Sequence, residues 1–372
     1  MSELSIEEKA RYARHLSLAE IGIKGQLRLK QSKVLVIGAG GLGAPLLLYL
    51  AAAGVGTIGI VDGDRVSSSN LQRQVLFDTT QIGMLKVEAA RHRLLSLNPF
   101  IDIRIHPVFI TRHNALELMA EYDIVADGSD NFPTRYLVND ACVLSGKPYV
   151  YGAIFRFEGQ VSVFNALLAE GNRGPNYRDL FPTPPAAGQI PNCEEAGVLG
   201  VLPGIVGALQ ANEVIKLITG VGNVGHGKLA IFDASTLNWY NMSFTARPDN
   251  MITALIDYES FCGMPAREGV PSISWQTLLR WENENKSFQL LDVRTKEERQ
   301  RQHIGGTHIP LDQIADYNIQ MVDNNLPTII YCQTGRRSHQ ATQLLMSMGL
   351  QQVFNLEGGI QQIPPSFLEA NS

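Results

Sequence analysis

The sequence is poor in cysteine, and this excludes one class of fold. Its 372 residues include four cysteines, Cys142, Cys193, Cys262 and Cys332. They are too few and too scattered for a disulfide framework, which indicates a reducing compartment.

Long uninterrupted apolar runs and an excess of positive charge are also missing. Residues 34–61 carry no charge and are long enough to cross a bilayer, but seven glycines and one proline interrupt them. The first 14 residues are charged and have no apolar core of the kind found in signal peptides. A net charge of −5 argues against electrostatic binding of nucleic acid. We therefore expect a cytoplasmic protein with no membrane segment and no nucleic-acid partner.

A glycine-rich turn organises the first part of the chain. Residues 34–37 are apolar, as in a buried parallel strand, and residues 44–53 are apolar and rich in helix formers. Between them lies Gly38-x-Gly40-Gly41-x-Gly43, and a second strand over residues 57–61 leads to Asp62. Glycines let the backbone approach a phosphate whose charge the helix N-terminus stabilises, and an acid after the second strand can hold ribose hydroxyls. The order of strand, turn, helix, strand and acid therefore predicts a nucleotide site.

Polar residues follow this second strand. Ser69, Asn70 and Arg73 come where side chains at the carboxyl edge of the sheet could reach phosphates. Lys86 begins a helical stretch over residues 86–97, where a single lysine is usually solvated. Arg14 lies on a charged helix near the N-terminus, for which solvation is again the default interpretation.

A later strand, residues 123–126, is followed by Asp127-Gly128-Ser129-Asp130-Asn131. These side chains could cap the next helix, or their oxygens could hold magnesium together with nucleotide phosphates. The sequence does not decide between the two. Further strands are predicted at residues 160–164 and 228–232.

The stretch between those strands, residues 167–197, is long, proline-rich and poor in regular pattern, which is typical of a functional or mobile loop. Cys193 lies near its end, ahead of a helix predicted over residues 198–219. A helix N-terminus would favour the thiolate form of this cysteine.

A change of composition at residues 249–270 indicates a boundary, and a second α/β unit follows. We expect a helix over residues 275–281, strands over 288–291 and 328–331, and a helix over 339–348. Cys332 lies in the loop between the last strand and the last helix, which reads Cys332-Gln333-Thr334-Gly335-Arg336-Arg337-Ser338. Successive backbone N–H groups and two arginines there can stabilise an anion, such as a thiolate, a persulfide or a phosphate.

These motifs resemble a known pair of modules. Residues 1–248 resemble the adenylyltransferases that activate ubiquitin-like sulfur-carrier proteins, relatives of the ubiquitin-activating enzymes. Residues 271–372 resemble a rhodanese domain, and residues 249–270 would be the linker. The matching motifs are Arg11-Tyr12-x-Arg14, the glycine turn, Asp62, Asn70-Leu71-x-Arg73-Gln74, Lys86, Asp127-x-x-Asp130-Asn131, Cys193-x-Glu195-x-Gly197-Val198, Asp292-Val293-Arg294, His303-Ile304-x-Gly306-x-His308-Ile309-Pro310, the Cys332 loop and Glu357-Gly358-Gly359.

The resemblance implies a Rossmann-like domain with a mixed sheet, followed by a smaller α/β domain. It implies that ATP is bound and that Asp130 holds Mg²⁺. It also implies a homodimer, in which Arg14 reaches the ATP of the partner subunit. The nucleotide-binding residues implied are Gly38, Gly40, Gly41, Gly43, Asp62, Ser69, Asn70, Arg73, Lys86, Asp130, Asn131 and Arg14.

The implied reaction begins with adenylation of the C-terminal Gly-Gly carboxylate of the carrier. Cys332 would then carry a persulfide sulfur, taken from a cysteine desulfurase or thiosulfate, and Cys193 would resolve an acyl-disulfide or form a thioester. The product, a carrier thiocarboxylate, would supply molybdopterin, tRNA thiolation, thiamine or a related pathway.

One departure concerns zinc. Relatives hold a structural zinc on two Cys-x-x-Cys pairs, whose positions here are Asn176, Asp179, Glu259 and Cys262. Structural zinc prefers thiolate and imidazole ligands, so we expect no zinc.

Three alternatives remain open. The glycine turn alone would also suit a nicotinamide-dependent oxidoreductase, although Arg73, Lys86 and Asp130 suit phosphate transfer better. The rhodanese domain could be a non-catalytic docking module, and Cys193 could be dispensable.

Overall fold

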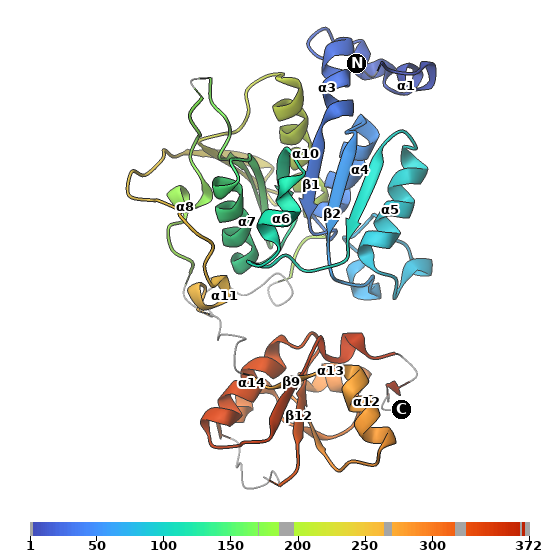
Figure 1. Ribbon diagram of the computed structural model, residues 1–372, viewed down its shortest axis with the longest axis vertical. Helices are drawn as coiled ribbons and strands as arrows, with labels where there is room; N and C mark the ends of the chain where they lie inside the picture. The colour runs from blue at the N-terminus through green and yellow to red at the C-terminus, as the bar shows by residue number, and fades with distance from the viewer. Residues whose placement is uncertain are drawn as a thin grey trace. The chain divides into compact units, whose positions relative to one another are not determined.

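The computed structural model describes residues 3–169, 171–185, 197–263, 270–316, 325–364 and 367–368. It separates into two compact units, the first extending to Gly263 and the second covering the rest (Figure 1). The stretch expected to be a linker therefore contributes one helical turn, α11 (Tyr258–Phe261), to the first unit. No described helix combines the length and the apolar character needed to cross a membrane.

The first unit is built on an eight-stranded mixed sheet in the order β3-β2-β1-β4-β5-β6-β7-β8. The half from β3 to β5 is parallel, and β6, β7 and β8 add antiparallel neighbours. The α/β class and the mixed sheet are confirmed. The strands are β1 (Lys33–Ile37), β2 (Thr57–Val61), β3 (Asp102–His106), β4 (Ile124–Asp127), β5 (Tyr149–Phe155), β6 (Glu158–Phe164), β7 (Lys228–Asp233) and β8 (Asn238–Ser243).

Helices cover both faces of this sheet because the parallel strands are apolar on both sides (Figure 1). In β1, Val34 and Val36 point into the core under α4, α5 and α10, whereas Leu35 and Ile37 point into the core under α6 and α7. The helices are α1 (Ile6–Arg11), α2 (Ala13–Leu16), α3 (Gly22–Gln31), α4 (Gly43–Ala53), α5 (Lys86–Leu97), α6 (Ala115–Ala120), α7 (Phe132–Leu144), α8 (Tyr177–Leu180) and α10 (Leu202–Thr219).

The residues at the starts of α1 and α10 explain where these two helices begin. Ser5 caps α1, because its Oγ accepts from the Glu8 N–H at 3.1 Å and the Glu8 carboxylate accepts from the Ser5 N–H at 2.7 Å. The helix predicted from residue 198 begins instead at Leu202. Val198 pairs with Arg156 in an isolated bridge, and Pro203, which lacks an N–H, fits the first turn of the helix.

The second unit is a five-stranded parallel sheet in the order β11-β10-β12-β13-β9. Ile330 in β12 faces the core under α14, while Ile329 and Tyr331 face the core under α12. The elements are β9 (Ser272–Ile273), α12 (Trp275–Asn283), β10 (Gln289–Asp292), α13 (Lys296–Arg301), β11 (Thr307–His308), β12 (Thr328–Tyr331), α14 (Arg336–Ser347) and β13 (Val353–Leu356).

Candidate active sites

The glycine turn between β1 and α4 closes tightly on neighbouring backbone. Gly38 has φ +89°, and its N–H donates to the Val61 carbonyl at 2.8 Å. A side chain on Gly43 would put its Cβ 2.0 Å from the Gly38 carbonyl oxygen. The turn also approaches the loop after β4, because the Gly128 N–H donates to the Ile37 carbonyl at 2.7 Å. Glycine is therefore required at Gly43 by close contact and favoured at Gly38 by a left-handed backbone.

Asp62 ties the turn to the end of β2. One of its carboxylate oxygens accepts from the Ala39 N–H at 2.8 Å, and the other accepts from the Asp64 N–H at 2.8 Å. Burial raises the pKa of Asp62, an effect that the nearby Lys86 ammonium opposes. The carboxylate thus lies beside the turn, where a ribose would bind in a Rossmann-like fold.

Lys86 is buried at the first residue of α5 and lies among three carboxylates. Its Nζ donates to Asp64 Oδ2 at 3.0 Å. Burial alone would lower the pKa of Lys86, but Asp62, Asp64 and Asp130 attract the ammonium and raise that pKa above its ordinary value. Lys86 is therefore not the solvated lysine expected by default, and a charged, buried ammonium is suited to bind phosphate.

The acidic cluster after β4 divides into structural and exposed members. Asp127 is fully buried and accepts from the Tyr149 hydroxyl at 2.7 Å and from the Ser129 N–H at 2.8 Å. Asn131 caps α7, since its Oδ1 accepts from the Thr134 N–H at 3.0 Å. Asp130 is exposed. Of the two interpretations of this segment, capping therefore applies to Asn131, and Asp130 is left exposed, where it could bind a metal ion.

Arg73 and the start of α10 border the turn. Arg73 donates to the Ser69 carbonyl at 3.3 Å, and a Cβ on Gly41 would lie 3.6 Å from Arg73 Cγ and 3.2 Å from Pro203 Cβ. Asn70 belongs to the 3-10 turn Ser68–Asn70 that sets the position of Arg73. The predicted residues from four segments of the chain are thus brought to one edge of the sheet.

Arg14 is not part of this cluster within one chain. It is exposed on α2, and the structure gives it no hydrogen bond or ion pair within the described residues. Its neighbour Tyr12 accepts from Asn98 Nδ2 at 2.8 Å, and the same nitrogen donates to the Ala51 carbonyl near the C-terminus of α4. Gly43 lies at the other end of this helix, eight residues before Ala51 and about 12 Å from it along the axis.

Two residues near this edge of the sheet were not predicted from the sequence. Asp64, which binds Lys86, lies two residues after Asp62. The signal in the sequence that could have identified it is this second acid in the loop after β2. Arg135 is buried in the first turn of α7 against the rings of Phe132 and Tyr151, and its Nε has no hydrogen-bond partner within the described residues. Nothing in the local sequence distinguishes Arg135 from a solvated helical arginine.

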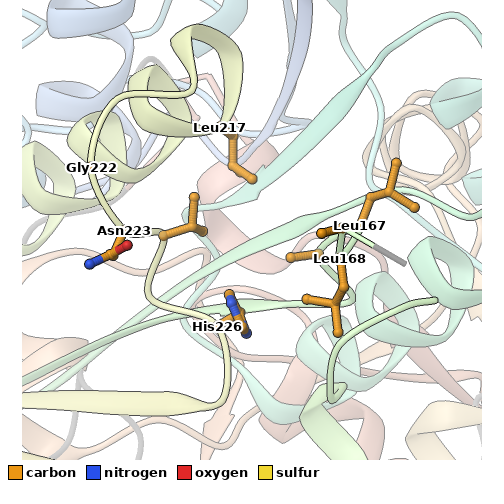
Figure 2. A pocket seen from close by; sticks show the side chains of 9 residues that line it. Leu167, Leu168, Leu217, Gly222, Asn223 and His226 are labelled. Carbon is orange, nitrogen blue, oxygen red and sulfur yellow. The ribbon is translucent and has the colours of Figure 1, made fainter. Parts of the chain in front are cut away.

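A hollow of about 260 Å³ elsewhere in the first unit is separate from these residues (Figure 2). Leu167, Leu168, Leu217, Asn223 and His226 are among its lining residues. Leu217 lies 14 residues after Pro203 on α10, which corresponds to about 21 Å along the helix. The hollow is therefore not part of the candidate nucleotide site.

Two of the four positions expected to correspond to zinc ligands in relatives, Asn176 and Asp179, form hydrogen bonds. Asp179 Oδ1 accepts from Asn250 Nδ2 at 2.8 Å, and Asp179 Oδ2 accepts from the Asn176 N–H at 2.7 Å. Beside them, Arg178 forms a fork with Asp140 at 2.8 and 2.7 Å, and Asp140 also accepts from the Tyr258 hydroxyl at 2.8 Å.

Cys262 is buried near this network, and burial raises the pKa of its thiol to about 11. An amide, carboxylates and a single protonated thiol do not fit a structural zinc ion. Within the described residues, no group of three or more His, Cys, Asp or Glu side chains is arranged to hold a metal.

In the second unit, Cys332 directly follows β12 and its sulfur is enclosed by its own loop. Sγ accepts from the Gly335 N–H at 3.1 Å. The Ser338 hydroxyl has one proton to donate, either to Sγ at 3.4 Å or to Asn355 Oδ1 at 2.7 Å. Gly335 has φ +84° and caps α14. The helix therefore begins at Arg336, three residues earlier than predicted, because this left-handed glycine turns the chain directly into it.

The rest of the loop is held by the Glu357-Gly358-Gly359 segment. The Ile360 N–H donates to the Cys332 carbonyl at 2.9 Å, and a Cβ on Gly359 would lie 2.3 Å from that carbonyl oxygen. Cys332 is fully buried. A backbone donor aimed at its sulfur distinguishes it from a cysteine packed only by apolar groups.

Arg337 is held by Glu298 in a fork with N–O distances of 2.7 and 2.6 Å. Gln333 and Thr334 are partly buried. The side chain of Arg336 and all of Cys193 lie outside what the structure describes.

Two family models match the chain. The ThiF family model matches residues 12–253, and the rhodanese-like domain model matches residues 274–363. The protein named "Probable adenylyltransferase/sulfurtransferase MoeZ" from Mycobacterium tuberculosis is 46% identical over 367 residues, which cover 96% of this chain and 93% of MoeZ.

Other relatives share the same parts. A sulfur carrier protein adenylyltransferase from Thermus thermophilus is 49% identical over 265 residues, covering 69% of this chain and 98% of that protein. The adenylyltransferase and sulfurtransferase MOCS3 from Drosophila grimshawi is 40% identical over 386 residues, covering 96% of this chain and 84% of MOCS3. The crystal structure of E. coli MccB with ATP has a TM-score of 0.56 at 23% identity over 65% of this chain and 74% of MccB, a likeness of fold.

Proposed function

The chain belongs to the ThiF family and carries a rhodanese-like domain after it, and from this premise we propose that it activates a ubiquitin-like sulfur-carrier protein and converts it to a thiocarboxylate. It is an adenylyltransferase and a sulfurtransferase. We assign adenylation to the first unit and sulfur transfer to the second.

One observation carries the first assignment. Lys86 stays charged while buried among Asp62, Asp64 and Asp130, next to a glycine turn and a helix N-terminus. Hydride transfer develops no phosphate charge and needs no such group, whereas adenylation builds negative charge on the phosphates of ATP. This favours adenylyl transfer over the oxidoreductase alternative.

In the proposed adenylation, the backbone of Gly38, Gly40, Gly41 and Gly43 approaches the phosphates, and Asp62 holds the ribose. Lys86 and Arg73 stabilise charge as a carrier carboxylate oxygen attacks the α-phosphorus and pyrophosphate leaves. Ser69 and Asn70 position Arg73. Asp130 and Asp64 offer exposed carboxylate oxygens of the kind Mg²⁺ prefers, and the ion would offset charge on the phosphates when bound.

We further propose that the enzyme acts as a homodimer. Arg14 lies near the C-terminal end of α4, whereas the glycine turn lies at its N-terminal end. An arginine there lies away from the nucleotide site of its own chain, which supports a role at the nucleotide site of a second subunit.

The second step is assigned to Cys332. Its thiolate attacks the sulfane sulfur of a donor, the donor's bond to that sulfur breaks, and the donor leaves with the electron pair. The terminal sulfur of the Cys332 persulfide then attacks the carrier acyl carbon and AMP leaves, giving an acyl-disulfide. Attack by the Cys193 thiolate on Cys332 Sγ would break that disulfide, joining the two cysteines and releasing the carrier thiocarboxylate; a reductant of the thiol class would then restore both thiols.

The docking-module alternative has less support. A module that only docks needs no backbone donor on its cysteine, whereas the Gly335 N–H lies 3.1 Å from Cys332 Sγ.

The test is ATP–pyrophosphate exchange with a Gly-Gly-ended carrier, followed by intact mass of the carrier after addition of a sulfur donor. Exchange together with the mass gain for replacement of –OH by –SH supports both steps. Exchange without the gain restricts the function to adenylation, and absence of exchange with every carrier tried contradicts the proposal.

A further inference from the structure

The arginine of the Cys332 loop whose side chain the structure describes is already paired. Arg337 lies five residues beyond Cys332, at the start of α14, and both of its terminal nitrogens donate to Glu298 of α13. The hydrogen bonds with Glu298 are the largest cause of a raised Arg337 pKa, to which Cys332 also contributes. With side-chain exposures of 31% and 27%, the pair is only partly open to water.

The other described arginines of this site are paired as well. Arg294 forms a fully buried fork with Asp292, at 2.9 and 2.6 Å. Arg299 lies 3.3 Å from the same carboxylate and donates to the Gly306 carbonyl at 2.7 Å. The charge of each is thus paired with Asp292, and separating a buried pair is costly. Arg294 Nη1 is buried and has no hydrogen-bond partner within the described residues.

This pairing bears on which sulfur donor can bind. Thiosulfate is a small dianion that needs two charges offset, and a guanidinium fork is the group best suited to do this. A persulfide, R–S–S⁻, carries one charge on its reacting sulfur. The Gly335 N–H and the N-terminus of the 12-residue α14 can stabilise one charge without Arg337.

We propose that Glu298 determines the sulfur donor: by holding the Arg337 fork, it disfavours dianionic thiosulfate and leaves the site selective for persulfide donors. This rests on the proposed role of Cys332 as the sulfur carrier. With either donor the thiolate of Cys332 forms an S–S bond to the outer sulfur. The leaving group is sulfite from thiosulfate and a thiolate from a persulfide, so the two reactions differ chiefly in the charge that the site must accept.

The test compares donors in Glu298→Gln. Glutamine keeps the capping box in which residue 298 accepts from the Thr295 N–H, so α13 retains its start. Steady-state kinetics with cyanide as acceptor would use thiosulfate or cysteine persulfide as the donor. We expect KM for thiosulfate to fall about tenfold in Glu298→Gln, as expected when one charge-assisted hydrogen bond becomes available, with little change for cysteine persulfide.

Two control variants separate the ion pair from general effects. Glu297→Gln removes the same charge from the neighbouring exposed position and should leave both KM values unchanged. Glu298→Asp keeps the charge and should keep the preference of the wild type. Equal losses with both donors in Glu298→Gln, or no change with either, would overturn the inference.

The premise fails separately, if Cys332→Ala still turns over or if no persulfide mass appears on Cys332. A persulfide on Cys332 with a donor preference unaffected by Glu298→Gln would leave the proposed function standing and refute only the role of Glu298.

Discussion

The two proposed sites share a plan and differ in where their charge comes from. Each lies where a parallel strand passes through a glycine-containing turn into a helix, at β1 and α4 in the first unit and at β12 and α14 in the second. In the first unit the turn carries no reactive side chain, and Arg73, Lys86 and Asp130 reach it from other segments. In the second unit the nucleophile lies in the turn itself, and the described arginines around it are bound to carboxylates.

The difference teaches what each site is suited to do. Asp64 and Asp130 are exposed beside Lys86, so the first site offers charges of both signs to a large charged ligand. Cys332 is buried and its sulfur accepts from a backbone N–H, so the second site is suited to stabilise a small anion that is covalently attached to the protein, such as a thiolate or a persulfide. The first site is thus suited to bind a charged ligand from solution, whereas the charge in the second site is on the protein's own cysteine.

The largest expected effect is the separation of the two reactions by single substitutions. Cys332→Ala should abolish thiocarboxylate formation and leave ATP–pyrophosphate exchange unchanged. Lys86→Ala should lower exchange by about 10²- to 10³-fold, as expected when a group that stabilises transition-state charge is removed, and should leave persulfide formation on Cys332 unchanged. Cys262→Ala is the control for loss of a buried thiol. Loss of both reactions in either variant would contradict the division of labour.

The fold was more predictable than the charge pattern of the sites. The α/β class followed from apolar segments and glycine turns, which are local signals, whereas the mixed sheet was expected from the family resemblance. Strands β5 and β8 were not predicted, and β8 is exposed along its whole length, so it has no buried face to produce a pattern.

The site residues divide in the same way. Gly38, Gly43 and Asp62 belong to one continuous motif, so their proximity could be anticipated. The binding of Lys86 to Asp64 and of Arg337 to Glu298 joins residues 22 and 39 positions apart, and local spacing contains no information about such pairs.

A buried and an exposed arginine–carboxylate pair of the first unit should differ in how much they stabilise the fold. Asp140→Ala should lower the free energy of unfolding of the first unit by about 3–5 kcal/mol, because it leaves the partly buried Arg178 unpaired and removes the partner of Tyr258. The measurement is urea unfolding followed by hydrogen exchange of peptides from each unit. Arg104→Ala, at an exposed pair, should leave stability nearly unchanged because solvent screens the pair. Destabilisation of the wild type by a zinc chelator would show that a metal, and not this network, holds the segment.

The glycines of the two turns should tolerate alanine poorly for different reasons. Gly43→Ala places a Cβ 2.0 Å from a carbonyl oxygen, and Gly335→Ala forces φ +84° and a contact of 2.9 Å with the Gly358 nitrogen. We expect each to lower the unfolding free energy of its own unit by about 1–3 kcal/mol. Gly204→Ala on α10, with no atom within 4 Å, is the control and should be neutral or slightly stabilising in thermal unfolding.

Acid should affect the two units in opposite directions. Burial would raise the pKa of Glu298 and Asp292, but Arg337 and Arg294 lower it below the ordinary values of 4.5 and 3.8. Their stabilisation is therefore present above those values and is lost as pH falls through the lower pKa of the folded protein. Burial raises the pKa of Asp62 and Asp127, so these groups take up protons in the folded state first and stabilise the first unit as pH falls.

Hydrogen exchange between pH 6 and 3, read separately on peptides from each unit, should show the second unit losing protection first. Glu298→Gln should reduce that sensitivity. Loss of protection in the first unit before the second would contradict the assignment of these carboxylates as the main acid-sensitive groups.

The smallest effect concerns how much of the anion stabilisation at Cys332 comes from a side chain. Ser338→Ala removes the hydroxyl 3.4 Å from Sγ and leaves the Gly335 N–H at 3.1 Å in place. Because one weak hydrogen bond is lost, persulfide formation should slow by about three- to tenfold, and its pH profile should shift to higher pH. Thr342→Val, in the same buried face of α14 but bonded only to the Ser338 carbonyl, controls for packing. A normal rate and pH profile in Ser338→Ala would assign the stabilisation of the Cys332 anion to backbone groups alone. The second site would then differ fully from the first, where side chains around Lys86 supply the charge.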